Sequence, residues 1–149
     1  MRYGGVLDGC LPPAPGCSIC RCSTTWLLRA LHHTHRPCGE LRDEAAQLAT
    51  RFGLPGFPAG HPRDCMPVDL QRAACAGAFL GNPVPLLEEP TFGVYPDLLV
   101  PLIHAIRWAR SHGSAVLWLT AAAAVWNAPS LPATSRYRLV GRQFMEVYR

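Results

Sequence analysis

Lysine is missing from this chain of 149 residues, in which arginine supplies all 14 Lys and Arg side chains. A phosphate-binding loop of the GxxxxGK[ST] type holds the β and γ phosphates of a nucleotide with backbone N–H groups and one lysine ammonium. Because the chain has no lysine, the sequence excludes a complete loop of this type.

Long apolar runs and an export signal are also lacking. No uninterrupted apolar stretch approaches the roughly 18 residues that suggest a membrane span. The first residues lead into a segment rich in proline, glycine and cysteine, and not into the apolar core of a signal peptide. We therefore expect a cytoplasmic protein without direct membrane insertion.

Charge of one sign is not concentrated anywhere. The formal net charge is +4, and the arginines are scattered along the sequence. Since a nucleic-acid-binding surface normally shows a basic face or helix, we expect no nucleic-acid partner. The hydrophobic fraction of 49% is sufficient for the core of one domain of ordinary size.

The seven cysteines allow two interpretations. Their odd number and the expected reducing compartment favour unpaired thiols over a disulfide framework. The alternative is a small zinc site, because Cys and His are the usual ligands of Zn²⁺. Its candidate ligands are Cys17, Cys20, Cys22, His32, His33, His35 and Cys38.

Helical patterns follow an irregular segment. Residues 1–22 show no sustained periodicity and contain Gly-Gly, Pro-Pro and Pro-Gly pairs, which indicate loop. The spacing of apolar residues then predicts several helices, the second of which should stop at Gly53. Pro101 should kink the last helix or move its start inward. The helices are expected from Ser23 or Thr24 to the residue before Arg36, over 39–52, over 67–80, and from Asp97 to His112.

Two short apolar runs are typical of buried parallel strands. The first lies before Glu88 and Glu89, and the second is Ala115–Thr120. Because α/β proteins place their ligand crevice at the carboxyl edge of such strands, the two carboxylates are a candidate site. With an alanine-rich turn or short helix over 121–128 and a terminal hairpin around Gly141, the element order predicts a layered α/β domain with flanking helices.

Several segments match one known motif set in the same order. In His61–Arg72, four residues agree with the pattern YPHQLSGGELQR, namely Pro62, Leu70, Gln71 and Arg72. Glu89-Pro90-Thr91 and Gly93 match the segment LLLLDEPTSGLD. Ala115–Thr120 is similar to a strand that precedes a switch histidine, and Arg138-Leu139 with Gly141-Arg142 is similar to a closing hairpin.

From about Gly39 to Val147 the chain resembles the C-terminal half of the ATP-binding domain of ABC transporters. The resemblance implies a partial P-loop NTPase fold. In this interpretation residues 1–22 are the irregular N-terminal segment, 23–82 the helical signature region and 83–149 a strand-helix-strand core. The strand and loop that carry the phosphate-binding lysine in the family would lie upstream of Met1, so we expect a truncated sequence.

The resemblance also implies roles for individual residues. Glu89 would be the catalytic carboxylate, and Glu88 would take the place of the aspartate that orients Mg²⁺. Tyr95 occupies the D-loop aspartate position, and Ala121 the switch histidine position. The signature region would comprise Cys65, Met66, Pro67, Val68, Asp69 and Gln71. The implied cofactors are ATP and Mg²⁺, and the implied partners are a transporter membrane subunit and a second ATP-binding subunit, at the inner face of the cell membrane.

These positions depart from the family at the atoms that matter. Glu88 is one methylene longer than aspartate, and Mg²⁺ demands near-ideal octahedral geometry. The side chain of Ala121 can donate no hydrogen bond, Met66 has no hydroxyl, and Pro67 has no N–H. We therefore expect a degenerate or truncated ATP-binding subunit that does not hydrolyse ATP alone. The alternatives are a non-catalytic protein-interaction module on an α/β scaffold and the zinc protein.

Overall fold

The structure is a computed structural model that describes residues 22–56, 60–81, 84–93 and 97–147, and in α1 the side chains from Trp26 onward. Most of the irregular segment predicted over 1–22 lies outside these residues. The elements, in chain order, are α1 (Cys22–His33), α2 (Cys38–Arg51), η2 (Pro62–Asp64), α3 (Pro67–Phe79), β1 (Leu86–Glu88), α4 (Leu99–Ser111), β2 (Leu117–Leu119), α5 (Ala123–Trp126), β3 (Tyr137–Val140) and β4 (Gln143–Glu146).

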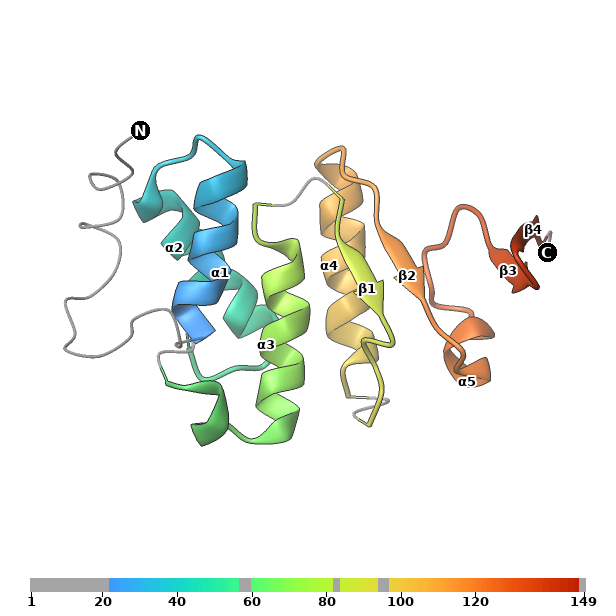
Figure 1. The fold of residues 1–149 in the computed structure, drawn as a ribbon, viewed down its shortest axis with the longest axis horizontal. Helices are drawn as coiled ribbons and strands as arrows, with labels where there is room; N and C mark the ends of the chain where they lie inside the picture. Colours follow the sequence, from blue (N-terminus) through green and yellow to red (C-terminus); the bar gives the residue numbers. More distant parts are fainter. Residues whose placement is uncertain (1–21, 57–59, 82–83, 94–96, 148–149) are drawn as a thin grey trace.

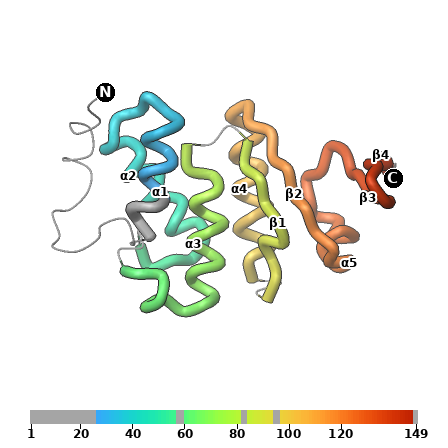
Figure 2. The backbone as a smooth tube through the Cα atoms, viewed as in Figure 1, coloured from blue at the N-terminus to red at the C-terminus, as the bar shows by residue number. Residues whose placement is uncertain are grey.

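The helices α1, α2 and α3 pack together at the N-terminal end of the described chain, and α3 also contacts α4 and β1 (Figures 1 and 2). Their apolar stripes meet in one core, because leucine and alanine recur at spacings of three and four. On α2 the buried stripe is Leu41, Ala45, Leu48 and Ala49. Gly53 follows with φ of 73°, so the predicted stop of this helix is confirmed.

The strands β1 and β2 form a parallel pair, as the sequence predicts. Leu86 lies opposite Leu117, Leu87 opposite Trp118, and Glu88 opposite Leu119. The long crossover through α4 is what a parallel connection requires. Because both strands run in the same direction, their carboxyl ends meet at one edge of the sheet.

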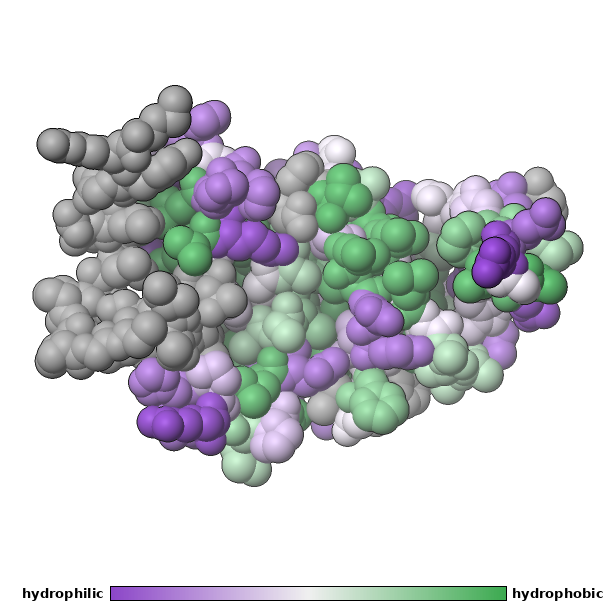
Figure 3. Space-filling model, viewed as in Figure 1, coloured by the Kyte–Doolittle hydropathy of each residue, from purple (hydrophilic) through white to green (hydrophobic). Residues whose placement is uncertain are grey.

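The prediction that both strands are buried is wrong for one face of this sheet. Leu87 is buried against the helices, but Leu86 is 59% exposed and Leu117 is 53% exposed. Side chains alternate between the two faces of a strand, so these leucines share the outer face with Leu119 and Glu88. Figure 3 shows the resulting apolar area over β1 and β2.

Boundaries elsewhere also follow the sequence. The helix α4 begins at Leu99, so Pro101 lies in its first turn, where the backbone N–H would have no intrahelical partner in any case. Gly113, with φ of 80°, follows the end of this helix. The predicted terminal hairpin is confirmed as the antiparallel pair β3–β4, with Gly141 in its turn.

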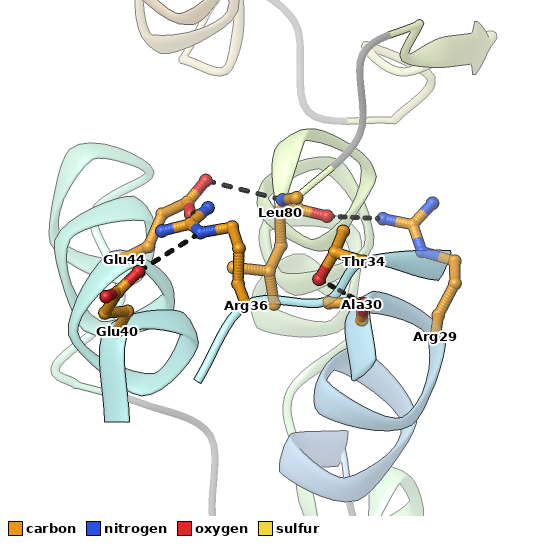
Figure 4. A network of polar contacts seen from close by, with 8 residues as sticks. Arg29, Ala30, Thr34, Arg36, Glu40, Glu44 and Leu80 are labelled. Carbon is orange, nitrogen blue, oxygen red and sulfur yellow. Dashed lines mark hydrogen bonds and ion pairs between the residues drawn. The ribbon is translucent and has the colours of Figure 1, made fainter. Parts of the chain in front are cut away.

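Polar contacts join the ends of the first three helices (Figure 4). Arg36 pairs with Glu44, and this hydrogen bond is the main reason why the pKa of Arg36 is raised. The same carboxylate accepts a hydrogen bond of 3.4 Å from the backbone N–H of Gly81. Arg29 donates to the carbonyl of Leu80 over 3.4 Å. The C-terminal end of α3 is thus held by side chains of α1 and α2 (Figure 4).

Candidate functional site

The candidate site lies at the carboxyl edge of β1 and β2. Glu88 is the last residue of β1, and the backbone N–H of Glu89 donates to the carbonyl of Leu119 at the end of β2, over 2.9 Å. Glu89 has φ of 41°, in the left-handed region that non-glycine residues rarely adopt. This conformation turns the chain out of the strand, and the predicted placement of the two glutamates at a strand end is confirmed.

The carboxylate of Glu89 is held by the first residues after β2. The Thr120 hydroxyl donates to its Oε2 over 2.8 Å, and the backbone N–H of Ala121 donates to its Oε1. The Thr120 oxygen in turn accepts from the N–H of Ala122 over 3.1 Å. The family-implied catalytic and switch positions are therefore direct neighbours. Although Ala121 has no side-chain donor, its main chain supplies one.

The turn after Glu89 is fixed by helix α3. The Pro90 carbonyl accepts from Gln71 Nε2 over 3.1 Å and from the Cys75 thiol over 3.6 Å. Thr91, in the same turn, is buried. The Cys75 thiol is itself buried, which raises its pKa to about 12. Gln71, which the resemblance places in the signature region, thus contacts the turn that follows Glu89.

The remaining signature residues surround the start of α3. Cys65 follows η2, and its thiol donates to the His61 carbonyl over 3.4 Å. Met66 is the N-cap residue and is 65% exposed, and Pro67 occupies the first turn. Val68 is half-buried, and Asp69 pairs with Arg72 over 3.6 Å. This helix end lies at the same end of the molecule as the carboxyl ends of both strands (Figure 1).

The described site offers little to a nucleotide. The Thr120 hydroxyl and the Ala121 N–H, donors that a phosphate could use, are both taken by Glu89. Glu88 is exposed and could serve as one carboxylate ligand of Mg²⁺, which usually takes its other ligands from phosphates and water. Tyr95 lies outside the described residues.

The zinc interpretation loses one candidate ligand. Cys38 is disulfide-bonded, so it has no thiolate for a metal, and the expectation of an unpaired thiol is wrong at this position. Cys17, Cys20 and the side chain of Cys22 lie outside the described part of the chain. Within the described part, no three His, Cys, Asp or Glu side chains come together as a metal site.

Sequence reasoning missed the partners of Glu89 and Pro90. Thr120 carried a usable signal, because it ends the second apolar run as Glu89 ends the first, and parallel strands bring these ends together. Gln71 and Cys75 lie four residues apart on α3 and therefore on one face of the helix. Their common acceptor could not be found without the path of the Pro90 turn.

Comparison with known proteins supports part of the family interpretation. No family model matches the sequence. A stretch of 91 residues, 60% of this chain, is 30% identical to nopaline permease ATP-binding protein P of Agrobacterium fabrum (strain C58). The chain thus contains an ABC ATPase-like region. The match spans 35% of the length of that relative, about a third.

None of the helices within 22–56, 60–81, 84–93 and 97–147 is long and apolar enough to cross a bilayer.

Proposed function

We propose that this chain is a degenerate part of an ABC-type ATP-binding subunit that does not hydrolyse ATP alone. The observation that carries the proposal is the carboxylate of Glu89, which accepts hydrogen bonds from Thr120 and Ala121 at the strand edge. Its proposed partners are a second ATP-binding subunit and a transporter membrane subunit, in the cytoplasm at the inner face of the cell membrane. ATP and Mg²⁺ are the cofactors that the relative's name and the motif resemblance imply.

The composition of the chain supports a loss of hydrolysis. The hydrogen bonds to Glu89 orient its carboxylate, and each oxygen keeps a lone pair for a further donor. The sequence also has no lysine to hold the β and γ phosphates. In this proposal Glu88 and Glu89 are the acidic residues of the site, and the chain has no lysine to complement them.

Phosphate release from Mg·ATP by the purified chain tests this proposal. We expect no turnover above the buffer rate, and the same result for Glu89→Gln, which keeps the shape of the side chain. Glu146→Gln, on the terminal hairpin, is the matched control for removal of one carboxylate. Turnover that disappears in Glu89→Gln but persists in Glu146→Gln would contradict the proposal.

A second candidate function is a non-catalytic interaction module. It is favoured by the outer face of the β1–β2 sheet, where Leu86, Leu117 and Leu119 are exposed. Parallel sheets are ordinarily covered on both faces, so this face suits a protein partner. Calorimetric titration with ATP and Mg²⁺ separates the two functions. Micromolar affinity supports the ATP-binding subunit, and absence of binding together with retained partner capture supports the module.

A further inference from the structure

The turn that follows β1 connects helix α3 with the strand edge. The backbone N–H of Phe92 donates to the Glu89 carbonyl over 3.0 Å, so residues 89–92 form a β-turn with Pro90 in its second position. The peptide group between Pro90 and Thr91 is the centre of this turn. Because both residues are buried, the Pro90 carbonyl is expected to have a hydrogen-bond partner within the protein.

Helix α3 supplies this partner. Gln71 Nε2 donates to the Pro90 carbonyl over 3.1 Å, and the Cys75 thiol donates to the same oxygen over 3.6 Å. A side-chain amide is a full N–H donor, whereas a thiol is a weak one, so Gln71 is the stronger of the two. The helix packs against β1 (Figure 1), and its contact with the carbonyl fixes the orientation of the central peptide from outside the turn.

The turn has no favourable second orientation for its central peptide. The other common arrangement is a type II turn, whose third residue needs a positive φ. Thr91 holds that position, and among the described non-glycine residues only Glu89 has a positive φ. Since a β-branched residue rarely adopts such a φ, a Pro90 carbonyl without its donor would reach water by opening of the turn and not by rotation of one peptide.

An open turn would change the conformation of Glu89. In the closed turn both of its main-chain groups are bonded, the N–H to the Leu119 carbonyl over 2.9 Å and the C=O to the Phe92 N–H. These two bonds accompany a φ of 41°, which persists only where the surroundings determine it. In this conformation the carboxylate accepts hydrogen bonds from the Thr120 hydroxyl and the Ala121 N–H.

We propose that Gln71 is a positioning residue for Glu89. Its hydrogen bond to the Pro90 carbonyl keeps the turn closed, and the closed turn keeps the Glu89 carboxylate bonded to Thr120 and Ala121. Helix α3 and the residues after β2 are coupled through this side chain, so a movement of α3 relative to the sheet would release the carboxylate. The coupling goes beyond the proposed function, because it requires neither ATP nor turnover.

Amide hydrogen exchange at Ala121 tests this coupling. Gln71→Glu keeps the shape of the side chain, but an ionised carboxylate cannot donate to a carbonyl. Exchange at Ala121 should become faster by about fivefold or more, the change that corresponds to the loss of one ordinary hydrogen bond. The Leu117 amide, which donates to the Pro85 carbonyl, should change little. Equal acceleration at both amides would mean general loosening of the chain and would overturn the proposal.

Two further variants separate the donor from the charge. Gln71→Met removes the donor without adding a charge, and it should also accelerate exchange at Ala121. Gln47→Glu is the matched control, since it adds the same charge at an exposed position of α2. It should leave exchange at Ala121 unchanged. An unchanged Ala121 amide in either Gln71 variant, or an equal response to Gln47→Glu, would contradict the positioning role.

Nuclear magnetic resonance of the unchanged protein gives a test that does not depend on the folding of a variant. The side-chain amide protons of Gln71 should exchange more slowly than those of the exposed Gln47. The nuclear Overhauser effect between the amide and α protons of Glu89 is strong at positive φ and should weaken in Gln71→Met. Equal side-chain exchange for the two glutamines, or an unchanged Glu89 signal in a folded Gln71→Met protein, would show that Gln71 does not position Glu89.

Discussion

Glu89 combines an unfavourable backbone conformation with a favourable set of hydrogen bonds. A non-glycine residue in the left-handed region costs on the order of 1–3 kcal/mol and persists only where the surroundings determine it. Here the surroundings are the Leu119 carbonyl, the Thr120 hydroxyl and the Ala121 N–H. A charge-assisted hydrogen bond contributes about 1.5–3 kcal/mol, so these contacts can offset the strain. Contacts with the end of β2 and with the two residues after it therefore hold Glu89 in this conformation. The same contacts supply the hydrogen bonds that its carboxylate accepts.

Cys75 makes folding sensitive to alkaline pH. Burial raises the pKa of this thiol from its ordinary value of 9.0 to about 12. Between these values the unfolded chain has lost the proton that the folded chain keeps, so stability is unaffected below pH 9 and falls as the pH rises above it. The slope from this thiol is at most about 1.4 kcal/mol per pH unit. Urea unfolding one unit below and one unit above the ordinary pKa of the thiol measures this slope.

Matched cysteine variants isolate this effect from other alkaline titrations. Cys75→Ala should lose the part of the pH slope that the thiol supplies. Cys65→Ala, which removes a half-buried thiol before α3, should keep the slope of the unchanged protein. An identical slope in Cys75→Ala and the unchanged protein would show that the buried thiol does not govern alkaline stability.

For single residues, the sequence predicts where a side chain lies in the fold better than it predicts which groups that side chain contacts. Glu88 and Glu89 could be placed at a strand end, because an apolar run precedes them and a Pro-Thr pair follows. The contact between Glu89 and Ala121 could not be predicted in detail, since it depends on the parallel register and on the positive φ of Glu89. The disulfide-bonded state of Cys38 was missed because the argument from an expected reducing compartment says nothing of distances.

Among the elements, α1 contacts α3 closely at Gly77. A Cβ atom built at Gly77 would lie 2.8 Å from Trp26 Nε1, with two further ring atoms of Trp26 at 3.0 and 3.1 Å. The indole thus packs where a side chain would otherwise stand. Arg29, on the same helix as Trp26, donates to the Gly77 carbonyl, so α1 contacts this turn of α3 through both a ring and a cation.

Gly77→Ala should therefore destabilise the fold. Alanine in place of glycine within a helix ordinarily gains about 1 kcal/mol, but overpacking against the indole costs about 1–3 kcal/mol. We expect a net loss of about 1 kcal/mol in the free energy of unfolding, measured by urea denaturation. Gly39→Ala is the control, since no atom lies within 4 Å of its Cβ position in α2. A Gly77→Ala protein as stable as Gly39→Ala would mean that the helices do not meet at this point.

Helices and turns were predicted well because their signals are local. The apolar spacing of α2, the proline at the start of α3 and the glycines after α2 and α4 act within a few residues. The strands were harder, since the run Ala115–Thr120 suggests burial on both faces but only β2 residues 117–119 form the ladder. Burial of a strand depends on what other elements cover it, which its own residues do not determine.

On the scale of the whole molecule, one face of the central sheet is exposed to solvent among the described residues. Its two strands are covered by helices on the face that includes Leu87, whereas the face with Leu86, Leu117 and Leu119 is open among the described residues. The fold positions Glu89 without enclosing the strand that carries it.

This open face should bind an apolar dye. Anilinonaphthalene sulfonate fluoresces when it meets accessible apolar surface, so the folded chain should enhance its emission at neutral pH without denaturant. Leu117→Glu places a charge in the middle of the apolar face and should reduce the enhancement about twofold or more, because exposed contiguous apolar patches are what such a dye detects.

The control variant is Val100→Glu. It changes a residue on α4 that is 58% exposed, against 53% for Leu117. It should leave the emission nearly unchanged, and circular dichroism of both variants checks that the helices persist. Equal reduction by the two substitutions would mean that the dye reports general loosening of the chain, and an unchanged signal in Leu117→Glu would mean that the outer face of β1 and β2 is covered in solution.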